Sequence, residues 1–255
     1  NTSPVAGLSY RLAPEVALYA SAGRGFETPT FSEIAYSSSS GPNFTLAAAR
    51  STNAEIGLKG RTDLHRFTLA RFSTTTRNEI VVDSSVSGRT YYKNASRTQR
   101  DGWEAAWNAT LPANVDTTLA YTTLKATYAE SFTSSTSTIA AGNVLPGVPA
   151  STLYAEVRWK HAPSGFSTAL EARRNAKIYV NDANSDAAEA YSVGNLRAGF
   201  EQTGPGWKMS QTLRIDNVAN RRYIGSVIVA DSNSRFFESA LPRSVSLMLS
   251  ARSTF

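Results

Sequence analysis

The lengths of the links between strand-like segments alternate along this sequence, and this alternation constrains the fold more than any other feature. Runs of about ten residues in which apolar and polar side chains alternate recur throughout the chain, with the period of two that is typical of β-strands. Helical periodicity is nearly absent. These runs predict an all-β protein with eleven strands, at residues 4–12, 15–26, 53–60, 64–82, 90–111, 115–128, 149–161, 166–180, 189–202, 207–217 and 241–255.

Every second link is short and rich in the Pro, Gly, Asn and Asp residues that tight turns require. The short links are residues 12–14, 60–63, 112–114, 162–165 and 203–206, and the long ones are residues 27–52, 83–89, 129–148, 181–188 and 218–240. In an up-and-down meander, successive links lie at opposite ends of the sheet, so the short turns share one end and the long loops the other. This is the plan of a transmembrane antiparallel β-barrel of the outer membrane.

Each predicted strand has one apolar and one polar face. In the strand at 149–161, Leu153, Val157 and Trp159 alternate with polar or charged residues. A soluble β-sandwich alternates in the same way, with its apolar face packed inward, so the periodicity leaves both folds open. Trp159 and Trp207 both adjoin short turns, where the aromatic girdle of a membrane barrel belongs, and this favours the barrel.

Composition excludes several classes of function. The chain has no cysteine, which excludes disulfides and thiolate chemistry. Its net charge of +6 comes from Lys and Arg residues scattered along the chain, without the basic run typical of nucleic-acid binding, so no nucleic-acid partner is expected. No stretch approaches ~18 consecutive apolar residues, so no membrane-spanning helix is expected.

No motif for catalysis or metal binding stands out. The sequence contains neither a G-x-S-x-G nucleophile motif nor a phosphate-binding glycine loop. We interpret His65 and His161 as ordinary barrel residues. Residues 182–186 begin like a calcium loop, but Ala187 and Val193 stand where its glycine and bidentate glutamate belong, so we predict a polar external loop. We expect no enzyme, no catalytic residue, no metal site and no cofactor.

The odd number of strands is itself informative, because single-chain bacterial barrels have even numbers. An open sheet in lipid leaves two edges of unpaired backbone groups, each costing several kcal/mol, and the sum exceeds the ~5–15 kcal/mol stability of a typical domain. Either the N-terminal part of the barrel is missing from this chain, or the strand count is wrong by one.

Five stretches resemble the TonB-dependent outer-membrane receptors, in the order of that family. ASAGRGFETPTFSEI at 20–34 resembles the approach to an external loop, and STNAEIGLKG at 51–60 resembles the strand that follows it. The other three are RDGWEAAWNATL at 100–111, LPGVPASTLYAEVRW at 145–159 and RIDNVANRRYIGS at 214–226.

The resemblance implies a barrel of twenty-two strands behind an N-terminal plug, of which residues 1–255 form the C-terminal portion of the barrel, with about eleven strands. The plug domain and the segment that contacts TonB are absent from this chain. Val218 and Ala219 replace the family's usual Leu-Phe pair, a mild departure. The implied function is TonB-dependent, energy-coupled import of a ferric siderophore or other metal chelate across the bacterial outer membrane, with TonB, the lipid bilayer and the outer-membrane assembly machinery as partners.

Three alternatives stay open. A related receptor can carry a different cargo, namely haem, cobalamin, copper or a glycan. A passive porin has the same barrel and loops but no plug. A soluble β-sandwich or propeller used for adhesion has the same alternation.

The candidate ligand contacts are Arg and Tyr or Phe residues predicted at the long-loop end and in the upper lumen, because these side chains suit a bulky anionic chelate. Acidic residues share this end, so no strong anion funnel is predicted, and the family counterpart of residues 220–223 recurs in receptors for different cargoes, which suggests a structural role. The candidates are Tyr36, Arg50, Arg89, Tyr91, Tyr128, Arg174, Tyr179, Arg221, Arg222, Tyr223, Arg235 and Phe236.

Thr30 and Glu33, in the long loop at 27–52, have the spacing of a capping box. The spacing predicts a short helix there, and the alternative is a chance match.

Phe255 resembles the C-terminal signal by which outer-membrane barrels are recognised for insertion. In the last strand Val245, Leu247, Leu249 and Phe255 share one parity, which we expect to face lipid. Replacing Phe255 by Ala should reduce barrel assembly more than ligand affinity, as measured by the amount of receptor at the cell surface and by ligand binding to that fraction. Normal surface levels of this variant would count against the role.

Overall fold

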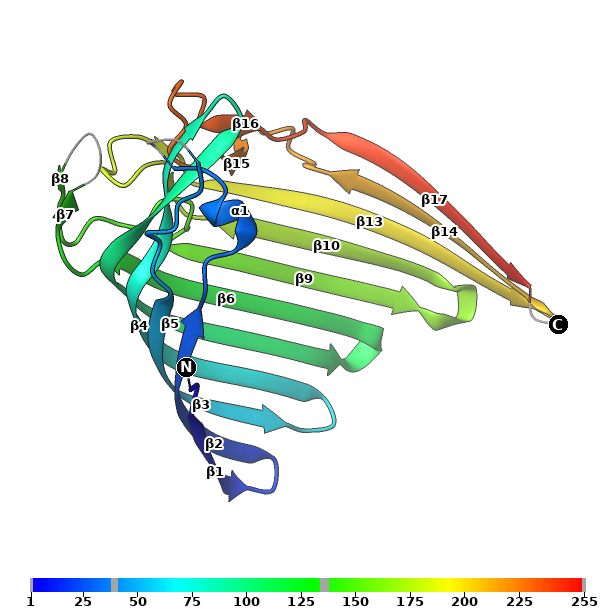
Figure 1. Cartoon of the computed structure of the whole chain (residues 1–255). Coiled ribbons are helices and arrows are strands. Elements are labelled where there is room, and N and C mark those ends of the chain that lie inside the picture. The colour runs from blue at the N-terminus through cyan, green and yellow to red at the C-terminus, as the bar shows by residue number, and fades with distance from the viewer. Residues whose placement is uncertain (1, 38–40, 134–137, 254–255) are drawn as a thin grey trace.

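The protein folds as one antiparallel sheet that curls into an open half-cylinder (Figure 1). The computed structural model describes residues 2–37, 41–133 and 138–253. No helix in these ranges is long and apolar enough to cross a membrane. The sheet strands, in spatial order, are β1 (Val5–Ala13), β2 (Val16–Glu27), β3 (Ala49–Arg61), β4 (His65–Val86), β5 (Arg89–Leu111), β6 (Val115–Tyr128), β9 (Ser151–His161), β10 (Phe166–Asn175), β13 (Tyr191–Gly204), β14 (Trp207–Asp216) and β17 (Ser244–Ser253).

The eleven predicted strands are all present, and each pairs with its predicted neighbours in sequence order. The short turns predicted from the sequence gather at one end of the sheet, and the long connections lie at the other end together with the turn between β4 and β5 (Figure 1). We call this latter end the loop end. The loop end also carries three small hairpins and one helix, namely β7 (Phe132–Thr133) with β8 (Thr138–Ile139), β11 (Ile178–Tyr179) with β12 (Ala187–Ala188), β15 (Ile224–Val227) with β16 (Phe237–Ser239), and α1 (Phe31–Ile34).

The prediction of a long loop at residues 83–89 is wrong. β4 continues to Val86 and β5 begins at Arg89, so two residues, Ser87 and Gly88, make the turn. Both have positive φ, at 49° and 77°, as the tight turn of a hairpin requires. The pairing of β4 with β5 continues through the polar stretch with a register shift after Val82. Near the tip of this hairpin, Ser85 forms an isolated β-bridge with Asp231, in the connection between β15 and β16.

The predicted strand at residues 166–180 is also shorter in the structure. β10 ends at Asn175, and Ile178–Tyr179 turns away to pair with Ala187–Ala188 as the small hairpin of β11 and β12. The capping-box prediction is confirmed, because the Thr30 side chain accepts from the Glu33 N–H while the Glu33 carboxylate accepts from the Thr30 N–H at 2.7 Å. Phe255 lies outside the described residues.

The two faces of the sheet differ as predicted. On the outer, convex face, Leu170 lies opposite Val157 on one side and Leu196 on the other, and 60% of its surface is exposed. Its neighbour Glu171 points to the inner face and is only 3% exposed. Within the described residues, the apolar outer face therefore stays uncovered, which is expected of a surface that lies in lipid.

The inner face is held together by charge pairs across neighbouring strands. The Glu171 carboxylate accepts two hydrogen bonds from Arg214, at 2.7 and 2.8 Å, and one from Asn195 at 3.2 Å. Arg197, on β13 between β10 and β14, donates to Glu156 on β9 at 3.2 Å. This bidentate arrangement fixes the long arginine side chains and satisfies a carboxylate that is removed from water.

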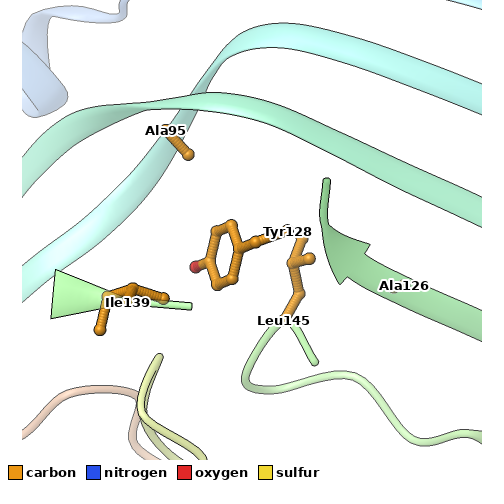
Figure 2. Close-up of a cluster of buried hydrophobic side chains, with 5 residues drawn as sticks. All are labelled: Ala95, Ala126, Tyr128, Ile139 and Leu145. Carbon is orange, nitrogen blue, oxygen red and sulfur yellow. The ribbon is translucent and has the colours of Figure 1, made fainter. Parts of the chain in front are cut away.

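A cluster of buried apolar side chains lies at the loop end of the sheet. It contains Ala95, Ala126, Tyr128, Ile139 and Leu145, which come from β5, β6, β8 and the connection to β9 (Figure 2). The cluster packs the connection after β6 against the inner face of the sheet.

Tyr128 is the central side chain of this cluster, with 1% of its surface exposed. Its hydroxyl donates to the Asp182 carboxylate at 2.6 Å, and Lys93 pairs with the same carboxylate at 3.3 Å and with Asp83 at 3.0 Å. Asp182, in the segment at residues 182–186, thus binds both the end of β6 and the hairpin of β4 and β5. Tyr128, predicted as a ligand contact, has almost no surface with which to touch a ligand and holds the loops in place instead.

Replacing Tyr128 by Phe should lower the free energy of unfolding by about 1–3 kcal/mol, because the buried Asp182 carboxylate loses a donor. Replacing it by Ala should cost about 3–5 kcal/mol, since a cavity opens as well. Denaturant unfolding of the receptor in lipid vesicles, followed by tryptophan fluorescence, measures both. Tyr121, exposed on the outer face, gives the matched control, and its change to Phe should be nearly neutral. Equal losses of stability at Tyr128 and Tyr121 would contradict the structural role assigned to Tyr128.

Candidate functional site

A pocket of about 720 Å³ opens at the loop end beside the start of β13. Its walls combine aromatic side chains with two guanidinium groups. The main contributors are Tyr191, Arg221, Arg222, Tyr223, Ile224 and Phe237. Three of the residues predicted to bind ligand, Arg221, Arg222 and Tyr223, are thus brought together in one cavity.

The turn that presents these residues is built by Asn217, which is buried and has a φ of 50°. Its side-chain oxygen accepts from the Arg221 N–H at 2.8 Å, and its side-chain nitrogen donates to the Arg221 carbonyl at 2.8 Å. Asparagine tolerates this left-handed conformation better than most residues. Asn220, also at a φ of 50°, accepts from the Arg243 N–H at 2.9 Å and ties the turn to the approach of β17.

The barrel wall fixes the position of this turn. The backbone N–H of Asn217 donates to Asn195 at 2.9 Å, and the Asn195 amide donates to Glu171 on β10. A chain of hydrogen bonds therefore runs from β10 through β13 to the turn that lines the pocket.

Two tyrosines form one wall of the pocket. The rings of Tyr191 and Tyr223 lie 4.2 Å apart at an angle of 31°, which is close to stacking. Asn175 donates to the Tyr191 hydroxyl at 2.8 Å. Arg221 donates to the Ser192 carbonyl at 3.2 Å and so is partly engaged. No salt bridge involves Arg222 within the described parts of the chain, and its side chain is exposed.

Tyr191 was not predicted as a ligand contact. It has the inner-face parity of Asn195 and Arg197 and is the first residue of β13 at the loop end. This parity is a sequence signal that identifies Tyr191 as an inner-face residue. Its pairing with Tyr223 depends on the turn at Asn217 and cannot be read from either strand alone.

A second cluster of predicted residues lies near α1. The Arg89 guanidinium sits 5.1 Å from the centre of the Tyr36 ring, and that ring lies 6.3 Å from the ring of Tyr91. The loop after α1 is tied to β5 by Asn43, whose amide donates to the Tyr92 carbonyl at 3.1 Å. Tyr36, in the connection after α1, therefore forms a compact group with Arg89 and Tyr91 of the β4–β5 hairpin.

The remaining predicted contacts are dispersed. Arg50 and Arg174 have the parity of the outer face, opposite Arg77 on β4 and Ser192 on β13. Tyr179 lies in β11, and the Lys177 ammonium lies over its ring, 4.9 Å from the ring centre.

Arg235 and Phe236 lie in the connection between β15 and β16. The Arg235 backbone N–H donates to Asp231 at 2.8 Å, and the Phe236 ring meets Phe237 edge-on at 6.1 Å. Phe237 belongs to the pocket, so Phe236 adjoins the pocket without lining it.

This chain is similar in fold to several solved structures of outer-membrane transporters. The siderophore receptor PiuA from Acinetobacter baumannii aligns with a TM-score of 0.76 at 18% identity, over 97% of this chain and 35% of that one. The ferric-catecholate import receptor Fiu from E. coli K12 aligns with a TM-score of 0.71 at 20% identity, over 98% and 34%. The copper transporter OprC aligns at 0.74 and 16% identity, over 98% and 39%. The chain spans little more than a third of their length.

The family model described as "TonB dependent receptor-like, beta-barrel" matches residues 1–220. Proteins of this family are transporters of the outer membrane of Gram-negative bacteria and are not enzymes, as predicted for this chain. The open sheet of eleven strands is a partial barrel of that kind. With its strand order, its two faces and its motifs in agreement, the chain belongs to the β-barrel family of the TonB-dependent receptors.

Proposed function

We propose that this chain is part of a receptor that imports a ferric siderophore, or a similar metal chelate, in a TonB-dependent and energy-coupled manner. The observation that carries the proposal is the pocket at the loop end, where the adjacent rings of Tyr191 and Tyr223 lie beside Arg221 and Arg222. Solved structures with the same fold include receptors whose names state a siderophore, a ferric catecholate or ferric yersiniabactin.

The chemistry of the pocket suits such a cargo. Its volume of about 720 Å³ lies in the usual range for small-molecule sites. Tyrosine rings offer flat apolar surfaces on which the aromatic or apolar parts of a chelate can stack. The exposed Arg222 offers planar, charge-assisted donors to the carboxylate or catecholate oxygens of an anionic chelate.

The cluster of Tyr36, Arg89 and Tyr91 offers the same chemistry on the neighbouring hairpin. We propose that it forms a first contact for the chelate at the outer rim, and that the pocket beside β13 holds the chelate next. Binding energy at the rim does not by itself move the cargo, so transport in this proposal requires a plug that TonB displaces.

We further propose that residues 1–255 are the C-terminal portion of the barrel and that the plug and the TonB-contacting segment belong to another part of the receptor. Two facts support this: the chain covers little more than a third of the length of its structural neighbours, and its open sheet leaves two edges.

The Arg222→Gln variant of the full receptor should raise the dissociation constant for the ferric chelate about tenfold, the loss expected for one charge-assisted contact. The measurement uses iron-limited cells and a panel of radiolabelled ferric catecholates, hydroxamates and citrate, with binding and uptake recorded separately. Arg174→Gln is the matched control, because Arg174 lies at the same end but has outer-face parity.

Deleting TonB should abolish uptake while binding to the surface persists. Uptake that continues unchanged without TonB would overturn the proposal in favour of a passive porin, which would also show steady ion conductance in planar bilayers. Saturable uptake of copper, haem, cobalamin or a glycan, with no response to any ferric chelate, would keep the energy-coupled receptor and replace the cargo.

A further inference from the structure

Three arginines lie on the outer face of neighbouring strands at the loop end of the sheet. They are Arg24 on β2, Arg50 on β3 and Arg77 on β4, and we call them the outer arginine cluster. Arg50 lies directly opposite Arg77, and Arg24 lies opposite Thr52, two positions along β3 from Arg50. All three share the parity of the exposed Ile56, which marks the outer face.

The cluster has no counter-charge of its own. Like charges directly opposite each other on neighbouring strands are destabilising. The three side chains are exposed, and in the described residues none has a carboxylate within 4.0 Å. Two neighbouring outward arginines on β4 and β5 differ: Arg71 pairs with Asp101 at 3.4 Å, and Arg97 pairs with Glu130 at 3.3 Å. The cluster is therefore open to an anion from outside the chain.

A hollow of about 680 Å³ adjoins the cluster, and its lining combines basic, hydroxyl and aromatic residues. The three guanidinium groups line it together with Phe26, Thr52 and Thr75. Guanidinium groups bind phosphate oxygens bidentately, and the threonine hydroxyls add further donors. Phe26 has 43% of its surface exposed, so an apolar group can pack beside the charge.

On β2 and β3 the cluster lies beyond the exposed apolar residues Leu18 and Ile56 of the outer face, on the side of the loop end. Phe67, next to the short turn, and Arg77 lie about ten residues apart on β4. At ~3.4 Å per residue and a tilt of ~40–45°, this distance corresponds to a rise of about 25 Å, the usual height of the apolar band of a membrane barrel. Phosphates of lipid headgroups lie at the edge of this band, whereas the inner face of the sheet is turned away from it.

From these observations we propose that the outer arginine cluster binds the phosphate groups of an anionic lipid in the outer leaflet. The bound phosphate supplies the missing counter-charge between Arg50 and Arg77, and the lipid's apolar part packs along Phe26. The site uses only the outward face of β2, β3 and β4, so it does not depend on the cargo or on energy coupling.

The test uses the full receptor purified in detergent, with diphosphoryl lipid A as the probe and native mass spectrometry as the readout. The double variant R50Q/R77Q should weaken lipid A binding about tenfold or more, because charge-assisted contacts are lost. R174Q is the control: Arg174 is also outward at the loop end, but its register partners are Leu153 and Ser192, and it should bind as the unmodified receptor does. Heat-modifiable migration on gels checks that each variant is a folded barrel.

Lipids that differ in charge separate the possible ligands. The unmodified receptor should bind monophosphoryl lipid A more weakly than the diphosphoryl form, and R50Q/R77Q should lose this preference. Inorganic phosphate at millimolar concentration should not displace lipid A. Unchanged lipid A affinity in the double variant, or displacement by inorganic phosphate alone, would overturn the proposal. Should the double variant fail to assemble, R77Q alone carries the same test, with a loss of about threefold expected and unchanged affinity contradicting it.

Discussion

The pairing of backbone hydrogen-bonding groups between neighbouring strands is the constraint on which the rest of this structure depends. In lipid no water is available to replace a missing partner, so each unpaired N–H or C=O group costs several kcal/mol. The chain meets this constraint with an uninterrupted antiparallel order from β1 to β17. β1 pairs only with β2 and β17 only with β14 within the described sheet, and in the proposed receptor these edges meet the remaining strands of the barrel.

Strand pairing also creates the two environments that the protein uses. Because successive side chains point to opposite faces, one backbone presents Leu170 to lipid and Glu171 to the lumen. The charge pairs of the inner face also help to position the candidate site. Through Asn195 and Asn217 they connect to the turn that presents Arg221 to the pocket, so the wall of the barrel positions its candidate binding site.

The number, order and facing of the strands could be predicted because they depend on local signals: a period of two and turn residues at fixed places. The boundary at residues 83–89 could not, because a polar stretch predicts a loop, whereas a register shift continues the strands to a two-residue turn at Ser87 and Gly88. Tyr128 looked like a rim residue because its burial depends on Asp182, far away in the sequence. Thr30 and Glu33 were recognised because a capping box is local.

Side-chain pairs that require two distant turns were the hardest to foresee. Arg222 and Tyr223 were found from their residue types, but the partnership of Tyr223 with Tyr191 needs the chain reversal at Asn217. Arg50 was predicted to face a ligand, and only the register with β4 shows that it is outward and opposite a second arginine. Residue type suggested the chemistry, and strand parity decided which compartment the side chain meets.

The most direct test of this account is the environment of adjacent residues on one strand. The chain has no cysteine, so single cysteines at Leu213 and Thr212 of β14 can carry nitroxide spin labels in the membrane-embedded receptor. Power saturation should show the label at 213 relaxed mainly by oxygen, which concentrates in lipid, and the label at 212 mainly by a polar nickel complex. Equal access of the two labels to the polar complex would contradict the assignment of the outer face to lipid, and with it the barrel.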